Sequence, residues 1–551
     1  MSTEIGPRRA RSGQAAAPRG KIILANTEKK IYNIEAERSA RDADGVITIT
    51  DSRIDYILKK GGRAVLLGLG VSNLPLAAFL REKYGLCGGR LTVRDIKPRD
   101  VLSARLGSLP AFAGAAGEAA VLVGGEDPAG SLCDAPDMSD TVIFRSPGIR
   151  PDAGEIPEAV SRGAFLTSEM EWFCERTPAD IFAVTGSDGK TTTTTLTYLL
   201  LKGAGRTSYV GGNIGTPLLD RADAMSRGDA AVLELSSFQL MTMRGPAKRA
   251  AITNISPNHL NWHRDMDEYT GAKYNVFGDG TELLVLNAKN PLSRAAAGRF
   301  DGRVVFFTAH PLPGEDFSDI TRGRPGSAAV WLEGDSIVFS DGTEKREILK
   351  RSGIRLPGLH NVENYMTAAA LTLGYVPDEV LREVARDFPG VEHRFELVRE
   401  LDGVRYYNSS IDSSPSRTVA ALSNLGCRPV VICGGRDKHV PFDSLAEALF
   451  ERASAVVLTG EAAGQIRGAI DSAREKRRDG GLSLTVREVP DFDGAVEAAR
   501  ELAHPGSAVL LSPACTSFDR FANFEERGRH FKEIVNGFSP RTGAAGKGGK
   551  A

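Results

Sequence analysis

The six cysteines of the sequence form no pair that would suggest a metal site or a disulfide framework. They are scattered along the chain, and no two stand in a CxxC arrangement: Cys87, Cys133, Cys174, Cys427, Cys433 and Cys515. Zinc sites and small disulfide-rich folds both need closely spaced cysteines. We therefore interpret these cysteines as small core residues of a protein in a reducing compartment.

Long apolar runs are missing too. No stretch approaches the roughly 20 apolar residues needed to cross a bilayer. The basic N-terminus, MSTEIGPRRARSGQAAAPRGK, has no apolar signal core. The sequence thus predicts a cytoplasmic protein without membrane insertion.

An excess of charge of either sign is absent as well. The 69 Lys and Arg residues nearly cancel the 70 Asp and Glu residues, which gives no bulk reason to bind nucleic acid or an anionic membrane. A chain of 551 residues exceeds one ordinary hydrophobic core, so we expect about three domains.

Short apolar runs alternate with helical stretches from residue 63 onward, a rhythm typical of parallel, doubly wound α/β domains. The strands expected in a first domain are 63–70, 91–96, 119–125 and 141–146. Those expected in a second are 181–186, 230–236, 249–256 and 282–288, and those in a third are 430–435, 455–460 and 508–514. Residues 297–355 are less regular, and we interpret them as an elaboration of the second domain.

These patterns predict five consecutive parts. They are an N-terminal extension over 1–58 that is partly disordered, a first domain over 59–178, a central domain over 179–389, a C-terminal domain over 390–538 and a disordered tail over 539–551.

The segment VTGSDGKTTTTTLTYLLL is the sharpest local signal, because it predicts a strand, a glycine turn and a helix that opens on Lys190 and Thr191. The amides of such a turn, the helix N-terminus and the lysine charge favour nucleotide phosphates, and the threonine hydroxyl suits Mg²⁺. Val184 stands where the longer pattern has glycine, so the match is to the shorter GxxGK[ST] form with Gly186 and Gly189. A glycine turn before a threonine-rich helix is the alternative interpretation.

Further along the chain, three separate residues offer groups that a metal-dependent phosphoryl transfer needs. Glu234 ends an expected strand, where its carboxylate suits a hard cation, and His259 is a further candidate ligand. A solvated carboxylate and a merely hydrogen-bonded histidine are the alternatives. Lys273 would be repelled by Mg²⁺ as an ammonium, whereas a lysine that has reacted with CO₂ carries an anionic carbamate.

Taken together, these segments resemble the Mur ligase family. The matching motifs occur in the family's order across about 470 of the 551 residues. They read TGSDGKTT, GGNIG, LELSSFQ, TNISPNHLNWH, YTGAK, LPGLHNVEN, GVEHRFE and LLSPACTSFDRFANFEERG.

The resemblance implies an α/β protein with three domains. They are an N-terminal Rossmann-like domain that binds UDP, a central P-loop ATPase domain and a C-terminal Rossmann-like domain for an amino acid. It further implies a ligase of peptidoglycan synthesis that uses ATP to phosphorylate a carboxylate, and an amine that attacks the acyl phosphate. ATP, two Mg²⁺ ions and a carbamylated Lys273 are the implied cofactors, and we expect a monomer.

Family roles transfer to individual positions of this sequence. The resemblance assigns catalytic roles to Lys190, Lys273, His259 and Asn213. It assigns metal coordination to Thr191, Glu234, His259 and Lys273. It assigns ATP binding to Gly186, Ser187, Asp188, Gly189, Lys190, Thr191, Thr192, Asn361, Asn364 and Arg394.

The outer domains resemble the family's D-glutamate-adding branch, which implies UDP-N-acetylmuramoyl-L-alanine and D-glutamate as substrates. Lys438 matches a lysine that pairs with the glutamate side chain, as suits a point charge. Further amino-acid-binding candidates are Ser413, Ser517 and Phe524. The candidates for UDP binding are Gly70, Ser72, Asn73, Asp95, Ser146, Pro147 and Gly148. GLGVSN alone would also suit NAD, but a dehydrogenase leaves the phosphate loop and the C-terminal motifs unexplained.

The chain departs from the branch at three places. Ser409 stands where an aspartate is common, so a carboxylate that would help to seat ATP is absent, and Asp412 is a candidate substitute. Asn258 and Asn261 are amides where acids are usual. We favour a working enzyme. The alternatives are a Mur-type or folylpolyglutamate-type ligase for another acceptor, and a catalytically weakened nucleotide-binding paralogue.

Overall fold

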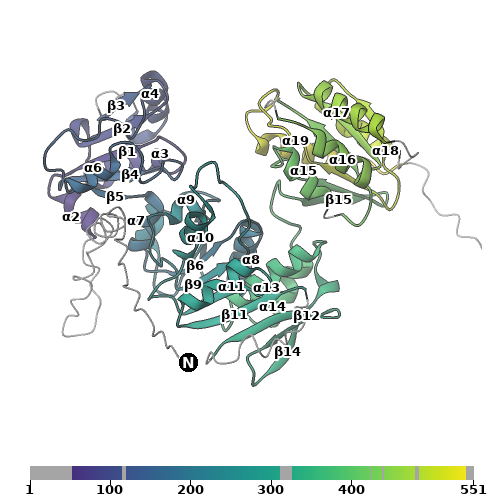
Figure 1. Cartoon of the computed structure of the whole chain (residues 1–551), viewed down its shortest axis with the longest axis horizontal. Helices are drawn as coiled ribbons and strands as arrows, with labels where there is room; N and C mark the ends of the chain where they lie inside the picture. The colour runs from purple at the N-terminus through teal and green to yellow at the C-terminus, as the bar shows by residue number, and fades with distance from the viewer. Residues whose placement is uncertain are drawn as a thin grey trace, which may run out of the picture. The chain divides into compact units, whose positions relative to one another are not determined.

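The structure is a computed structural model that describes residues 52–113, 119–310, 326–423, 425–436, 440–477 and 483–541. The chain divides into two compact units, Met1–Arg176 and Thr177–Ala551. Figure 1 shows the helices and strands of both units, each considered by itself below.

The first unit is built on a five-stranded sheet in the order β3-β2-β1-β4-β5, with every neighbouring pair parallel. Its strands are β1 (Arg63–Leu67), β2 (Leu91–Asp95), β3 (Val121–Gly124), β4 (Thr141–Arg145) and β5 (Phe165–Thr167). Its α-helices are α2 (Arg53–Lys59), α3 (Asn73–Tyr84), α4 (Arg99–Gly107), α6 (Ile156–Ser161) and α7 (Glu169–Arg176). Each parallel connection passes through a helix or a longer loop, as parallel pairing requires.

Helix α2 begins within the stretch that the sequence analysis assigned to the N-terminal extension, and polar contacts hold it to the rest of the first unit. The Asp55 carboxylate accepts hydrogen bonds from the Tyr84 hydroxyl and from Arg176 Nη1, the latter at 3.1 and 3.0 Å. Trp172 Nε1 donates to Ser52 Oγ at 3.3 Å. These contacts tie the start of the described chain to α3 and α7.

The second unit contains two sheets. The first has nine strands in the order β14-β13-β12-β11-β10-β9-β6-β8-β7. These are β6 (Asp180–Thr185), β7 (Ser208–Gly212), β8 (Ala230–Glu234), β9 (Arg249–Ile252), β10 (Leu283–Asn287), β11 (Arg303–Thr308), β12 (Ala328–Glu333), β13 (Ser336–Ser340) and β14 (Lys345–Lys350). The associated α-helices are α8 (Lys190–Gly203), α9 (Ser237–Leu240), α10 (Met266–Tyr274), α11 (Pro291–Ala295), α13 (Leu359–Leu371) and α14 (Asp378–Asp387).

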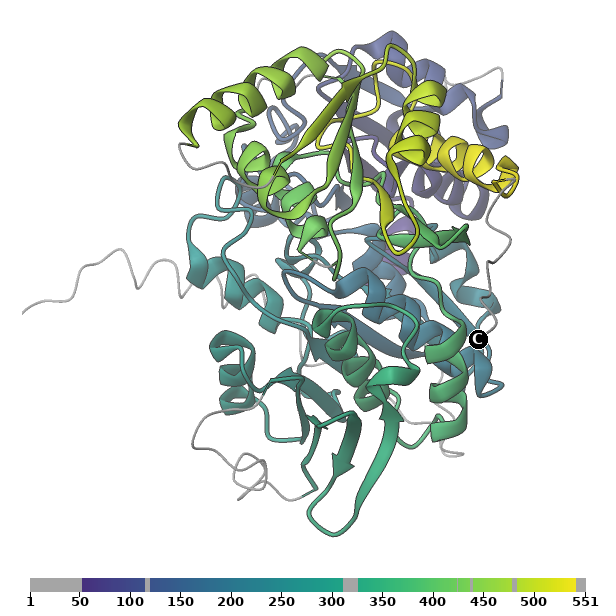
Figure 2. The same cartoon turned by 90° about the vertical axis from the view of Figure 1, so that its right-hand side faces the viewer.

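The described residues of the stretch 297–355 continue this sheet. Strand β12 pairs in parallel with β11, and β13 and β14 add antiparallel strands at the edge, which Figure 2 shows in green. The interpretation of this stretch as irregular was wrong in detail, because antiparallel edge strands need neither a long crossover nor a continuous apolar run.

The other sheet has six strands in the order β15-β16-β20-β17-β18-β19. They are β15 (Glu396–Leu401), β16 (Val404–Asn408), β17 (Val430–Gly434), β18 (Ala455–Thr459), β19 (Thr485–Glu488) and β20 (Ala508–Leu511). Its helices are α15 (Pro415–Leu422), α16 (Asp443–Arg452), α17 (Ala463–Lys476), α18 (Phe492–Leu502) and α19 (Phe524–Gly537). One core joins alternate strand residues to α15, α16 and α17, and a second joins the intervening residues to α18 and α19. This two-faced burial is that of a doubly wound sheet.

All eleven strands predicted in the sequence analysis are present, each within four residues of its expected ends. The predicted α/β fold class is therefore confirmed. Short 3-10 helices complete the elements at Gly88–Arg90, Pro110–Phe112, Leu219–Ala224, Ala296–Arg299 and Arg351–Gly353. Within the described residues, no helix has the length and apolar character needed to span a membrane.

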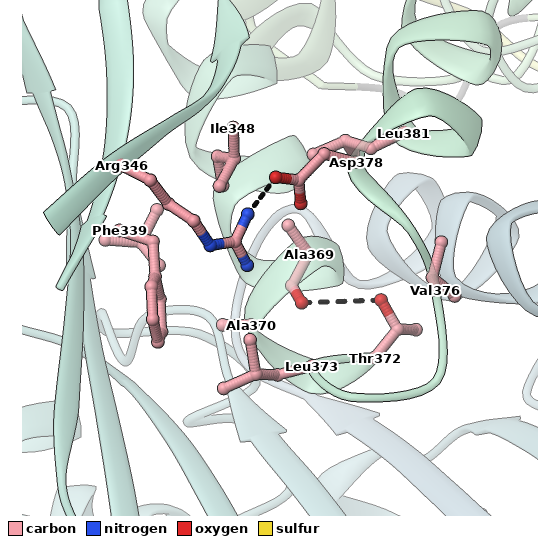
Figure 3. Close-up of a pocket in the computed structure, with 11 residues that line it drawn as sticks. Phe339, Arg346, Ile348, Ala369, Ala370, Thr372, Leu373, Val376, Asp378 and Leu381 are labelled. Atoms are coloured by element: carbon pink, nitrogen blue, oxygen red, sulfur yellow. Dashed lines mark hydrogen bonds and ion pairs between the residues drawn. The ribbon is translucent and has the colours of Figure 1, made fainter. Parts of the chain in front are cut away.

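A small cavity of about 20 Å³ lies between the β13–β14 hairpin and helices α13 and α14. Figure 3 shows Arg346 of β14 paired with Asp378 at the start of α14 beside this cavity. A space of this size holds about one water molecule. None of the candidate site residues lines the cavity, so we assign it to packing.

Candidate active site

The phosphate loop lies between β6 and α8, as predicted. Gly186 and Gly189 have φ angles of 146° and 78°, which disfavour any residue with a side chain. A Cβ at Gly186 would lie 1.9 Å from Thr253 Oγ1, and one at Gly189 would lie 2.5 Å from Asn364 Oδ1. Both glycines are therefore needed for the loop to fit beneath β9 and α13.

Lys190 opens α8 and folds back over the loop. Its Nζ donates to the carbonyl oxygens of Gly186 and Ser187 at 3.0 and 2.9 Å. Burial lowers the pKa of this amine, and the charge of Glu234 opposes that shift. An ammonium has three N–H donors, so one remains for a phosphate oxygen.

The rest of the loop is fixed by neighbouring segments. Ser187 Oγ donates to Ser256 O at 3.0 Å and lies 2.9 Å from the Tyr269 hydroxyl, while Asp188 N donates to Asn254 Oδ1 at 2.9 Å. Thr191 is buried, and Thr192, next along α8, is half-buried.

Glu234 lies at the carboxyl end of β8, directly beside the loop's own strand β6. Its side chain is 2% exposed. Oε1 accepts a 2.9 Å hydrogen bond from Asn213 Nδ2, and Asn213 N donates to Glu234 O at 2.8 Å. Oε2 is buried and has no hydrogen-bond partner among the described residues. A buried carboxylate oxygen is expected to be satisfied, so this atom suits a cation or donor that is not among the described residues.

His259 lies on an exposed loop after β9 and has a left-handed φ of 54°. Its ring contacts Phe238 with centroids 4.9 Å apart. Partial burial and the charge of Lys190 lower its pKa, which favours the neutral form that binds metals. Asn258 Oδ1 accepts from His259 N at 2.9 Å, and Asn261 is exposed.

Lys273 on α10 is 1% exposed and shares an acceptor with Lys190. Its Nζ donates to Gly186 O at 2.7 Å and lies 4.5 Å from the centroid of the Tyr269 ring. Burial, followed by the charge of Lys190, holds the pKa of Lys273 well below its usual range. Two ammonium groups on one carbonyl oxygen would repel each other, so the neutral amine is favoured at Lys273.

Asn361 and Asn364 on α13 border the start of α8. Asn364 Nδ2 donates to Asn361 Oδ1 at 3.2 Å, and Thr193 Oγ1 donates to Asn364 Oδ1 at 3.2 Å. Asn361 Nδ2 donates to Pro357 O at 2.7 Å. The two amides are thus next to the phosphate loop, although each is also engaged in holding the helices together.

Arg394 follows the left-handed residue His393, whose φ is 62°. Burial lowers the pKa of the Arg394 guanidinium, and the charge of Glu234 opposes the shift most strongly. Its Nε is buried without a partner in the described part of the chain. The guanidinium therefore lies within electrostatic range of the phosphate-loop cluster, defined as Lys190, Glu234, His259 and Lys273.

The candidate UDP-binding residues of the first unit gather at the carboxyl ends of β1, β2 and β4. Asp95 Oδ2 accepts from Leu69 N at 2.6 Å, and the fully buried Asn73 donates through Nδ2 to Gly68 O at 2.8 Å. Ser146 Oγ donates to Gly68 O at 3.0 Å. Asp95, Asn73 and Ser146 are thus engaged in shaping the loops. The remaining candidates, which line the same loops without being buried, are Gly70, Ser72, Pro147 and Gly148.

The candidates for amino-acid binding lie at the carboxyl ends of β16 and β20. Ser517 is 2% exposed, and the half-buried Phe524 begins α19, with its ring centroid 6.1 Å from that of His393. Ser413 lies in the loop between β16 and α15. Lys438 lies outside the described residues, so its predicted role stays a prediction.

Two family models match this chain. The Mur ligase middle domain matches residues 184–372, and the Mur ligase glutamate ligase domain matches residues 393–515. A UDP-N-acetylmuramoylalanine–D-glutamate ligase from Ruminiclostridium cellulolyticum is 42% identical over 482 residues, which are 87% of this chain and 97% of that protein. The chain belongs to the Mur ligase family.

Similar proteins include other Mur ligases. A protein of the same name from Acetivibrio thermocellus is 41% identical over 483 residues, 87% of this chain and 97% of that one. Among solved structures, a UDP-N-acetylmuramate-alanine ligase from Thermotoga maritima is 18% identical and covers 86% of this chain and 99% of its own, with a TM-score of 0.48. As a member of the family, this Mur ligase is an ATP-dependent amide ligase.

The residues of the Mur ligase phosphate-loop cluster fit a magnesium ion that is shared with ATP. No group of three or more His, Cys, Asp and Glu side chains within the described ranges would hold a metal by itself. Mg²⁺ usually takes one or two protein ligands together with substrate phosphates and water. Glu234 Oε2, buried and without a partner among the described residues, is consistent with that arrangement. Thr191, in the first turn of α8, stays the predicted second ligand.

Sequence reasoning missed a buried polar chain that holds the His259 loop. His263 Nε2 lies 2.9 Å from Ser237 Oγ, and His263 Nδ1 lies 3.2 Å from Glu268 Oε2. His263 N also donates to His259 O at 2.9 Å. The motif NHLNWH contains both histidines, and their four-residue spacing was the available signal.

Arg527 was missed as well. This residue is 2% exposed and donates to Ser410 Oγ at 3.0 Å, Ser410 O at 2.8 Å and Cys515 O at 3.3 Å. Burial lowers its pKa to about 10. It joins the loops that carry Ser413 and Ser517, and the ERG at the end of the last motif was its only sequence signal.

Replacing Glu234 by glutamine is expected to raise the Mg²⁺ concentration needed for half-maximal turnover by about tenfold, because metal-site changes typically cost 10–100-fold in affinity. The amide keeps the shape and the Asn213 contact but loses the anionic Oε2. A Mg²⁺ titration of ATP turnover measures the effect. Glu282→Gln, at an exposed carboxylate that pairs with Lys248, is the matched control, and an equal shift in both variants would contradict the assignment.

Proposed function

We propose that this Mur ligase adds D-glutamate to UDP-N-acetylmuramoyl-L-alanine in peptidoglycan synthesis. The observation that carries the proposal is the phosphate loop beside a buried carboxylate oxygen, Glu234 Oε2, that lacks a partner among the described residues. The names of relatives that are 41–42% identical over 87% of the chain support these substrates.

The reaction has two balanced steps. First, the bond between the β-phosphate oxygen and the γ-phosphorus of ATP breaks as a carboxylate oxygen of the muramoyl-alanine bonds to that phosphorus, which releases ADP. The amine of D-glutamate then attacks the acyl carbon, the bond to the phosphate oxygen breaks, and phosphate and one proton leave.

The residues of the cluster suit the first step by position and charge. Lys190 retains an N–H for the transferring phosphate, and it lies at the N-terminus of α8, whose first backbone amides favour an anion. Mg²⁺ bound at Glu234 would neutralise phosphate charge, and we expect two such ions. Positioned positive charge of this kind is the main source of acceleration in phosphoryl transfer.

Lys273 fits a carbamate because its amine is buried and burial holds its pKa well below the usual range, which favours the neutral form that reacts with CO₂. In that modification Nζ bonds to the carbon of CO₂ and loses one proton to water, which leaves one negative charge. The product would be a ligand for a cation next to Gly186 O.

The amino acid would bind in the C-terminal domain, with Ser517 and Phe524 near its carboxylate and Lys438 near its side chain. The loops at Gly70–Asn73 and Ser146–Gly148 would bind UDP. We expect the enzyme to act in the cytoplasm as a monomer and to need no nucleic acid.

The test is release of phosphate from ATP by the purified chain with UDP-N-acetylmuramoyl-L-alanine and a panel of amino acids. Turnover is expected with D-glutamate, whereas L-alanine, L-lysine, diaminopimelate and L-glutamate should give rates near the background without an amino acid. Preference for another acceptor would assign the chain to a different branch, and no turnover with any would support the weakened paralogue.

A further inference from the structure

Arg394 is carried by an unusually constrained turn. The residues on both sides of it, His393 and Phe395, have left-handed φ angles of 62° and 51°, which are uncommon for residues with side chains. Arg394 N donates to Val391 O at 2.9 Å and closes the turn. Such a backbone persists only where surrounding contacts determine it.

Those contacts come from the segment that follows β16. Ile411 N donates to His393 O at 3.2 Å, and Phe395 N donates to Ser409 Oγ at 3.2 Å. Asn408 Nδ2 lies 3.0 Å from His393 Nδ1. Each flanking residue of Arg394 is therefore attached to the segment 408–411.

The hydroxyl of Ser409 is itself oriented. Because its oxygen accepts the Phe395 N–H, its single proton is free for another acceptor. Ser409 is joined to Asp412 directly, since Asp412 N donates to Ser409 O at 3.0 Å, and the Ser409 hydroxyl opposes the rise that burial causes in the pKa of the Asp412 carboxyl. Asp412 Oδ2 also accepts from Ser512 Oγ at 2.8 Å. Ser409 and Asp412 are 2% and 8% exposed, so the chain of hydrogen bonds from Phe395 to Asp412 is shielded from water.

We propose that Ser409 and Asp412 act together as positioning residues for Arg394, so that a serine hydroxyl and a carboxylate three residues away hold the arginine turn toward bound nucleotide. The inference rests on the proposed function for the role of Arg394. It also gives Ser409 a structural role, since this serine connects Asp412 to the backbone at Phe395, next to Arg394.

The electrostatics agree with this arrangement. Burial raises the pKa of Asp412, while the hydroxyls of Ser409 and Ser512 and the charges of Arg417 and Arg394 oppose that shift. Asp412 therefore has donors and positive neighbours that suit a carboxylate. A second carboxylate at position 409 would lie beside it in a buried space, which like charges disfavour.

The experiment measures binding of a non-hydrolysable Mg²⁺–ATP analogue to the full chain by calorimetry, followed by steady-state kinetics. Ser409→Ala and Asp412→Asn are each expected to weaken analogue binding about tenfold, as the loss of a buried hydrogen bond at a charged group would. KM for ATP should rise in parallel, while KM for the amino acid should stay within about twofold of the original.

Exchanging the residues at positions 409 and 412 distinguishes a positioning role from a general loss of stability. Ser409→Asp alone and Asp412→Ser alone should each weaken analogue binding, whereas the double variant Ser409→Asp/Asp412→Ser should recover most of the loss because one carboxylate is again present. Strong coupling of this kind is expected for residues in contact. Losses that simply multiply in the double variant would overturn the proposal.

Ser507→Ala is the matched control, since Ser507 is a buried serine at the opposite end of β20 that bonds to His504 N and O. It should lower the melting temperature without changing analogue binding. If it weakens binding as much as Ser409→Ala, the effect is structural and the proposal is wrong. Because analogue binding needs no turnover, a wild-type chain that binds the analogue but lacks D-glutamate-dependent turnover would contradict only the proposed function.

Discussion

Replacing Lys190 by alanine is expected to lower kcat/KM by about a thousandfold, the upper range for losing one preorganised charge at a transferring group. Lys190 Nζ is held 3.0 and 2.9 Å from two loop carbonyl oxygens at the start of α8. Its remaining N–H donor and its charge lie at the N-terminus of α8, where the first backbone amides of the helix favour an anion. No other described lysine besides Lys273 donates to this loop.

The fold should survive this change. Gly186 O keeps its bond from Lys273, so only Ser187 O loses the lysine as a donor, a cost of about 1 kcal/mol. The melting temperature and the rate of phosphate release together measure the two effects. Lys202→Ala is the control on the same helix, because Lys202 is exposed in the last turn of α8. Near-normal turnover by Lys190→Ala would refute the phosphate-loop assignment.

Replacing Lys273 by alanine is expected to lower turnover about a hundredfold, at the upper end of losses from metal-site changes. The physical reason differs from that at Lys190. The Lys273 amine is buried and 2.7 Å from Gly186 O, and burial holds its pKa well below the usual range. Its proposed contribution therefore comes from the carbamate rather than from positive charge. Added bicarbonate should not restore the alanine variant.

The carbamate itself is detectable. With ¹³C-labelled bicarbonate, the original chain should give a protein-bound carbonyl NMR signal that Lys273→Ala lacks and that Lys248→Ala retains. Lys248 is a suitable control because its Nζ is paired with Asp180 at 2.8 Å, away from the loop. If Lys273→Ala keeps near-normal turnover, or if both variants keep the signal, the carbamate proposal fails.

Prediction from sequence worked best where one short pattern determines one local structure. The strand, glycine turn and helix of residues 180–203 follow from apolar residues, from glycines at positive φ and from a lysine at the helix start. Strand β14, KREILK, was not predicted, since its charged residues are tolerable only at the sheet edge. Which residues of β14 are buried depends on neighbours that are distant in the sequence.

The contacts of individual side chains were also beyond prediction from the sequence, because they depend on neighbours distant in the sequence. Glu234 was predicted as a metal ligand. The sequence did not show that Asn213 occupies one of its oxygens while the other lacks a partner among the described residues, because this depends on the pairing of β7 with β8. Asp95 and Asn73 were predicted to touch substrate, yet they bond to the loops of their own unit. Sequence spacing cannot distinguish a group that binds a ligand from one that shapes the loop beside it.

By itself the sequence determined the family, the α/β class and the phosphate loop, because these depend on residue type at fixed local spacing. Only the tertiary structure decided that Lys190 and Lys273 share one carbonyl oxygen and that Asp412 reaches the Arg394 turn through Ser409. These arrangements join residues from separate strands and helices. Their distances, and with them the pKa shifts and hydrogen-bond partners, arise only when the sheets and helices pack.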